Sequence, residues 1–156
     1  REVRAAAALL RHDFGVDADV WSLTSINELR RDGLDAERWN MLHPTAKVPR
    51  VPWITRMLEG ATGPVIASTD YMRNYADQVR EHVQAAGRRY VVLGTDGFGR
   101  SDYRVKLRRF FEVDRYYVVV AALKALADEG TVPAAKVAEA IKKYGIRADK
   151  INPLYA

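Results

Sequence analysis

The sequence predicts an α/β domain whose mostly parallel sheet is covered by helices on both faces. Three short candidate strands follow one another along the chain, residues 18–24, 65–68 and 90–94, and the second and third each precede a segment of helical periodicity. Short strands that alternate with helices are typical of a parallel sheet with crossover helices. Because three strands are few for 156 residues, we expect a further strand upstream of Arg1 and a chain that is a fragment of a larger protein.

The amino-terminal segment predicts a helix, a strand and a second helix. Apolar residues recur at helical spacing over residues 1–14, and Gly15 readily adopts the left-handed conformation that ends many helices. After the candidate strand, Ser25 is expected to cap a helix, because Glu28 follows at the spacing of a capping box.

The next segment is expected to be less regular. A separate short helix is predicted over residues 36–42, and it should end at His43, because the residue before a proline such as Pro44 disfavours the helical conformation. The prolines within residues 44–52 predict an extended connection, which leads to another short helix over residues 53–58.

Two helices are expected around the second and third strands. Asp70 is predicted to cap one that runs as far as Val83, with its apolar residues on one face. Ser101 is predicted to cap the other, which ends at about Phe111.

The carboxy-terminal part predicts two more helices and an irregular tail. Asp114 is expected to cap the first, which Gly130 closes. The second begins near Pro133 and ends at Gly145, and residues 146–156 are expected to be irregular.

Composition narrows the class of protein. The chain suits one domain over residues 1–156, and it contains no cysteine, which excludes disulfides, thiolate metal sites and a cysteine nucleophile. That usage fits a reducing, cytoplasmic compartment. The net charge is +5, but no recognition motif accompanies it, so no nucleic-acid partner is expected. No apolar run approaches the roughly 20 residues that span a bilayer, so no membrane role is expected.

The most informative segment is the loop after the third strand, which consists of Thr95, Asp96, Gly97, Phe98, Gly99, Arg100, Ser101 and Asp102. Ligands and neighbouring domains commonly bind at the carboxyl ends of parallel strands. The glycines match neither a phosphate loop nor a dinucleotide fingerprint. Two roles stay open: a rigid turn that contacts another domain, and an anion site in which Arg100 and Ser101 lie at a helix N-terminus.

No catalytic, cofactor-binding or metal-binding residue is predicted. The histidines His12, His43 and His82 are far apart and share no ligand spacing. The loop lacks the regular ligand spacing of a calcium site, and Ser101 has no histidine at a known triad spacing.

Several segments together resemble the C-terminal domain of the homodimeric type of pyruvate dehydrogenase, the thiamine-dependent first component of that complex. The resemblance is carried by residues 17–22 (DADVWS), 27–33 (NELRRDG), 37–44 (ERWNMLHP), 67–72 (ASTDYM) and 92–102 (VLGTDGFGRSD). Residues 111–114 (FEVD) and 149–153 (DKINP) also fit. The likeness covers nearly the whole chain in order.

The resemblance implies a three-layer αβα fold of the transketolase C-terminal type, without its first strand. It implies a parent enzyme that decarboxylates pyruvate on thiamine diphosphate, held by magnesium, and that acetylates the lipoyl group of the dihydrolipoyl acyltransferase component. In that family these ligands belong to two upstream domains, so this domain is expected to bind no cofactor and to be inactive alone.

The role that the resemblance leaves to this domain is assembly. Its expected partners are the other domains of the parent chain, the second subunit of a homodimer and the acyltransferase component. The Thr95–Asp102 loop is the first candidate contact, and Trp39 and His43 form the second. The alternative is a small regulatory domain that binds anions through the same loop.

Overall fold

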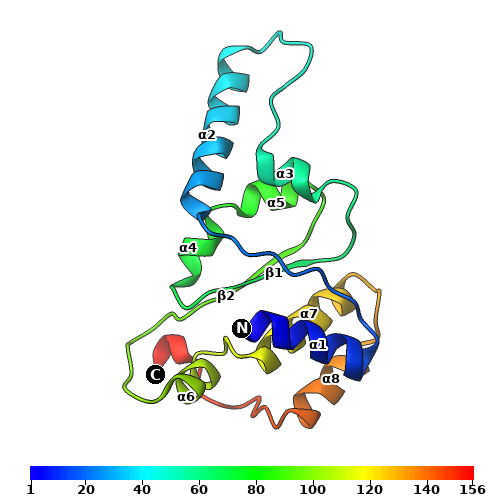
Figure 1. The fold of residues 1–156 in the computed structure, drawn as a ribbon, viewed down its shortest axis with the longest axis vertical. Coiled ribbons are helices and arrows are strands. Elements are labelled where there is room, and N and C mark those ends of the chain that lie inside the picture. Colours follow the sequence, from blue (N-terminus) through cyan, green and yellow to red (C-terminus); the bar gives the residue numbers. More distant parts are fainter.

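The computed structural model describes residues 1–156 and shows two parallel strands between two groups of helices (Figure 1). In chain order the elements are α1 (Glu2–Phe14), α2 (Ile26–Leu42), α3 (Trp53–Leu58), β1 (Val65–Ser68), α4 (Arg73–Asp77), α5 (Arg80–Ala85), β2 (Tyr90–Leu93), α6 (Arg104–Phe110), α7 (Arg115–Asp128), α8 (Ala134–Lys143) and the 3-10 turn η1 (Pro153–Tyr155). None of these helices is both long and apolar enough to cross a membrane.

The two strands divide the hydrophobic core. They pair in parallel with Val65 opposite Tyr90. Because side chains alternate along a strand, Ile66 and Leu93 pack against a first core of buried residues from α1, α7 and α8, whereas Tyr90 and Val92 belong to a second core with residues from α2 to α5. The predicted α/β class and the three αβα layers are therefore confirmed.

Helix α7 is the centre of the first core. Asp114 caps it as predicted, because its carboxylate accepts hydrogen bonds from the backbone N–H groups of Tyr116 and Tyr117, both at 3.0 Å. Val119 and Leu123 are fully buried where α7 packs against α1 and α8. Burial on most sides of α7 accounts for its run of β-branched and aromatic residues, 116–120, a composition that is also typical of strands.

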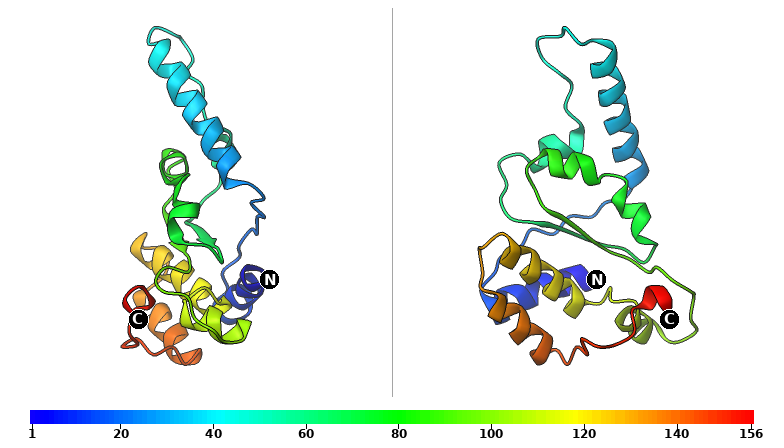
Figure 2. Two further views of the ribbon diagram at one scale, coloured as in Figure 1. Left: turned by 90° about the vertical axis from the view of Figure 1, so that its left-hand side faces the viewer. Right: turned by 180° about the vertical axis from the view of Figure 1, so that it is seen from behind.

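Helix α2 projects from the body as an arm (Figures 1 and 2). The predicted Ser25 cap is confirmed by a 3.3 Å hydrogen bond from the backbone N–H of Glu28. The separate helix over residues 36–42 is wrong, because α2 is continuous through Asp35 and ends at Leu42. Glycine weakens a helix by about 1 kcal/mol, but here Gly33 packs against the buried ring of His82, and this contact favours continuity.

The predicted strand over residues 18–24 is wrong. The sheet contains only β1 and β2, and this segment runs from α1 to α2 with Val20, Trp21 and Leu23 all exposed. Its β-branched and aromatic residues satisfied the local pattern of a strand, but it hydrogen-bonds with neither strand. A strand is stable only when its backbone groups join a ladder.

The predicted caps at Asp70 and Ser101 are also wrong. Helix α4 begins at Arg73, and the Asp70 carboxylate instead binds Arg108 at 2.8 Å. The helix expected as far as Val83 is divided into α4 and α5. Near the division, the Ala76 carbonyl accepts a hydrogen bond from the Tyr90 hydroxyl, and the Gln78 carbonyl accepts one from the Arg30 guanidinium. Helix α6 begins at Arg104 without a side-chain cap.

Candidate functional site

The Thr95–Asp102 loop starts at the carboxyl end of β2, where its first residues bind the segment that follows β1. The Thr95 N–H donates to the carbonyl of Tyr71 at 2.8 Å, and its hydroxyl donates to the carbonyl of Asp70 at 2.9 Å. The Asp96 carboxylate accepts from the Arg73 N–H at 3.1 Å and pairs with the Arg73 guanidinium at 3.2 Å. Asp96 thus stabilises the start of α4 from a distant part of the sequence, in the place predicted for Asp70.

The middle of the loop packs against the carboxy-terminal tail. Gly97 has φ 98°, and a Cβ atom at this position would lie 2.2 Å from the carbonyl oxygen of Pro153. Asn152 caps the tail turn by accepting the N–H of Leu154 at 3.0 Å, and Lys150 donates to the carbonyl of Phe110 at 2.5 Å. Only glycine combines this positive φ with so close a backbone approach, so the loop is held from both sides.

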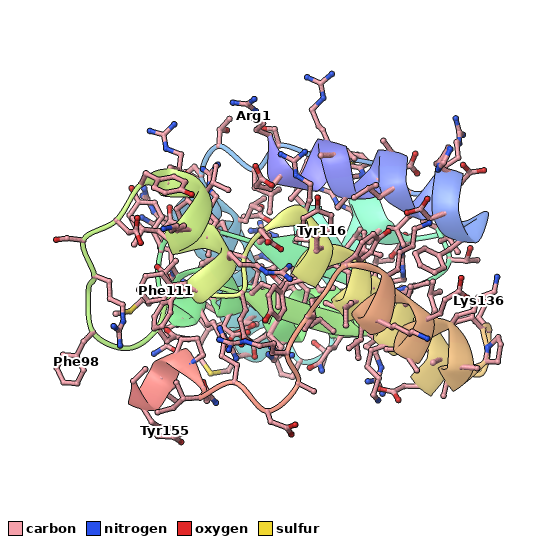
Figure 3. The ribbon with its side chains drawn as sticks, turned by 90° about the horizontal axis from the view of Figure 1, so that it is seen from below. Arg1, Phe98, Phe111, Tyr116, Lys136 and Tyr155 are labelled. Atoms are coloured by element: carbon pink, nitrogen blue, oxygen red, sulfur yellow. The ribbon has the colours of Figure 1, made fainter.

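Phe98 lies at the tip of this fixed loop and is 77% exposed. Figure 3 shows its ring pointing away from the body, on the same side as Tyr155. The segments that contact the loop carry further exposed side chains, namely Tyr71, Met72, Tyr103, Leu154 and Tyr155. We call these five residues and Phe98 the carboxyl-edge patch. Contiguous exposed apolar side chains are typical of interaction surfaces, so this set of residues is a candidate contact surface.

The second half of the loop borders a shallow hollow. Arg100, Ser101 and Asp102 line it together with Lys106 and Phe110, and its volume is about 290 Å³. The Arg100 guanidinium lies 4.3 Å from the centre of the Phe110 ring. The structure therefore brings Arg100 and Ser101 to one hollow, although α6 is short and starts beyond them.

A charge network holds the helices below the loop. Arg108 pairs with Asp70 at 2.8 Å and with Glu2 at 3.6 Å, and Glu2 also binds Arg115 at 2.9 Å. The hydrogen bond from Arg115 holds the pKa of the Glu2 carboxyl below its usual range. These residues come from α1, α6, α7 and the loop after β1, so no local sequence pattern reveals the network.

Trp39 and His43 lie at the end of the arm, opposite the Thr95–Asp102 loop in Figure 1. Their rings stack with a centre-to-centre distance of 4.3 Å, and the Arg50 guanidinium covers Trp39 at 4.7 Å. The Asn40 side chain donates to the carbonyl of Arg50 at 2.9 Å and accepts its N–H at 2.8 Å. The arm tip is therefore organised by its own residues, and the two predicted contact regions are separate.

No sequence pattern predicted one cluster of side chains, which consists of Glu37, Glu81 and His82. His82 on α5 is buried, with Nδ1 3.7 Å from Glu37 of α2 and Nε2 3.9 Å from Glu81. The His82 Nε2 atom has no hydrogen-bond partner. The three side chains offer ligand atoms within 4.8 Å of one another, so they are the residues with which to test the prediction that the chain binds no metal. His12, in contrast, is exposed and pairs with Asp13.

Comparison with known proteins agrees with this architecture. A family model described as the transketolase-like C-terminal domain matches residues 1–114. Over 154 residues the chain is 62% identical to the pyruvate dehydrogenase E1 component of Pseudomonas aeruginosa and 60% identical to that of Cupriavidus necator. Over 156 residues it is 56% identical to the pyruvate dehydrogenase E1 component of Escherichia coli K12. These alignments cover 99–100% of the chain and 17% of each relative.

Proposed function

The chain belongs to the family of transketolase-like C-terminal domains, and from this premise we propose that it is the assembly domain of a pyruvate dehydrogenase E1 component. The proposed parent enzyme decarboxylates pyruvate on thiamine diphosphate and acetylates the lipoyl group of a dihydrolipoyl acyltransferase component. The identity of 56–62% to proteins of that name supports this assignment.

The residues that line the hollow beside the loop and a second hollow that adjoins it do not fit thiamine diphosphate and magnesium. Magnesium in such sites is held by carboxylates together with the phosphates. The two hollows at the carboxyl edge are shallow, and Asp102 is the sole carboxylate that lines either of them, beside several cations. We therefore derive no chemical step within this chain and assign the cofactor to other parts of the parent enzyme.

The observation that carries the assembly role is the fixed presentation of Phe98. Its ring is 77% exposed, while the loop beneath it is held by the bonds of Thr95 and Asp96 and by the packing of Gly97 on Pro153. A rigid loop loses little conformational entropy on binding, and buried aromatic anchors contribute much of the energy of an interface. We propose that the carboxyl-edge patch contacts another domain of the parent chain or the second subunit.

Replacing Phe98 by alanine in the full-length enzyme tests this role. We expect a weaker dimer or a lower rate of pyruvate decarboxylation, measured by sedimentation and by steady-state kinetics. Phe98→Tyr keeps the ring and serves as the matched control. Unchanged assembly together with an unchanged rate in Phe98→Ala would contradict the proposal.

The arm tip is the second proposed contact. Trp39 and His43 stack at the end of α2, where Met41 is 71% exposed, and the segment that follows carries Val48, which is 77% exposed. This pattern matches a preformed apolar tip that inserts into a neighbouring surface. The corresponding test is Met41→Ser combined with Val48→Ser, with dimer dissociation as the readout and Val105→Ser as an exposed control on α6.

The regulatory anion site stays a second candidate because Arg100 and Ser101 line one hollow. It predicts that phosphate, pyruvate or an acyl-coenzyme A shifts the NMR resonances of Gly97, Gly99, Arg100 and Ser101. No response up to millimolar concentrations would leave the assembly role alone at this loop.

A further inference from the structure

A second hollow, of about 300 Å³, adjoins the one beside the loop. The two share Asp102, Lys106 and Phe110, so they form one groove between α6, α7 and the segment after α8. We call it the basic groove and define it by the charged residues that line it: Arg100, Asp102, Lys106, Arg109, Arg147 and Lys150. The cations come from two separate parts of the sequence, residues 100–109 and 147–150, and the groove extends well beyond the predicted loop.

The cations of the basic groove exceed its anions. Arg109 pairs with Asp114 at 3.3 Å and Lys150 with Glu112 at 3.1 Å. Arg100, Lys106 and Arg147 form no ion pair, and Asp102 accepts a hydrogen bond from the backbone N–H of Tyr103. Three positive charges therefore face the groove without a carboxylate partner, although acidic residues neutralise many other arginines of this chain.

Aromatic rings orient several of these cations. Arg100 and Lys150 lie 4.3 Å and 5.1 Å from the centre of the Phe110 ring. Arg109 lies 5.3 Å from the Tyr117 ring, and its guanidinium also donates to the carbonyl groups of Tyr144 and Gly145 at 2.8 Å and 3.0 Å. Cation–π contacts and these hydrogen bonds hold part of the charge in place before any ligand arrives.

The shape of the groove decides between ligand classes. A small anion is usually bound in an enclosed site with convergent donors. This groove is open, and its hollows include only Leu107, Phe110 and Tyr117 as apolar or aromatic lining. Cations spread along an open groove match carboxylates spread along a chain. We propose that the basic groove binds an acidic peptide segment of a partner protein, through at least two of its carboxylates.

The test uses the full-length polypeptide that carries this chain and a fluorescein-labelled peptide of alternating Glu and Asp. We expect saturable binding by fluorescence anisotropy that weakens steeply as salt rises, because the contacts are ionic. A peptide of alternating Gln and Asn serves as the uncharged probe and should not bind. Failure of the acidic peptide to bind at low salt would overturn the proposal.

Matched variants locate the binding. Lys106→Gln combined with Arg147→Gln should weaken binding of the acidic peptide about fivefold, which corresponds to about 1 kcal/mol for the two exposed ion pairs together. The control Arg38→Gln combined with Lys142→Gln removes the same charge from exposed positions outside the groove, and it should change affinity less than about twofold. Equal losses in the two variants would show a diffuse charge effect and reject the groove. Displacement of the peptide by micromolar inorganic pyrophosphate would instead reveal a small-anion site and also reject it. Circular dichroism verifies that both variants fold.

Discussion

The Thr95–Asp102 loop and the tip of the arm both present exposed apolar side chains, but they are held in opposite ways. The loop is fixed by residues distant in sequence, since Asp96 binds Arg73 and Gly97 packs against Pro153. The arm tip is fixed by residues close to it in sequence, because Asn40 hydrogen-bonds to the backbone of Arg50 and the Trp39 ring stacks on His43. The conformation of the loop therefore depends on the whole fold, whereas that of the tip is largely local.

This difference predicts how substitutions spread. A change that disturbs the loop base should lower global stability, because it separates β2, α4 and the tail at once. A change at the arm tip should loosen the tip alone, because few contacts connect it with either hydrophobic core.

The largest effect is expected for Gly97→Ala. The new methyl group would lie 2.2 Å from the Pro153 oxygen at a residue with φ 98°, so strain and overpacking should lower the free energy of unfolding by about 3 kcal/mol. Gly99→Ala is the matched control, since a Cβ there meets nothing within 4 Å, and it should cost less than about 1 kcal/mol. Urea denaturation compares the two, and equal losses would contradict a tail-dependent loop.

A smaller loss, about 2 kcal/mol, is expected for Gly33→Ala in the middle of α2. Its Cβ would lie 2.0 Å from Nε2 of His82, so the ring must move and α2 would shift relative to α5. The second substitution His82→Ala in the same chain should recover part of the stability, and thermal unfolding measures both. No recovery in the double variant would show that the clash is not with His82.

The charge network beneath the loop should contribute about 1 kcal/mol at neutral pH. Because Arg115 lowers the pKa of Glu2 in the folded state from its ordinary 4.5, the contribution is complete above that value and is lost as the pH falls through the lowered pKa. Glu2→Gln should therefore lower stability at pH 7 and flatten its acid dependence. Denaturation between pH 7 and pH 2 tests this, and an unchanged acid slope would rule out Glu2 as its source.

The smallest global effect, about 0.5 kcal/mol, is expected for Asn40→Ala at the arm tip. Its two hydrogen bonds to the backbone of Arg50 are exposed, so their loss should chiefly free the tip. Hydrogen exchange should accelerate at the Arg50 amide and remain slow at Val119, in the core of α7. Acceleration at both amides would show that the tip is coupled to the whole fold.

Local sequence signals predicted the elements whose causes are local. The strand over Val65–Ser68 and the helix over Trp53–Leu58 are confirmed, as are the caps of Ser25 and Asp114, since each cap acts on amides two or three residues away. The glycine that ends α1, Gly15, is confirmed with φ 66°. These features depend on backbone geometry within one turn, which a short stretch of residues specifies.

Long-range contacts account for the expectations that failed. Residues 18–24 have the composition of a strand but pair with no neighbouring strand. Asp70 is of a residue type that often caps helices, but its carboxylate pairs with Arg108 instead. The cap near α4 came from Asp96, which is 23 residues beyond Arg73. The Thr95–Asp102 loop was predicted as the candidate site, but the basic groove beside it was not, because Arg147 and Lys150 join it from the tail.

By itself the sequence determined the α/β class, most of the helices and the position of the Thr95–Asp102 loop after a strand, because periodicity and capping act over a few residues. The tertiary structure alone decided that the sheet has two strands, that Phe98 stands free on a fixed base and that uncompensated cations line one groove. The physical reason is that strand pairing, ion-pair choice and exposure depend on which distant segments meet in space.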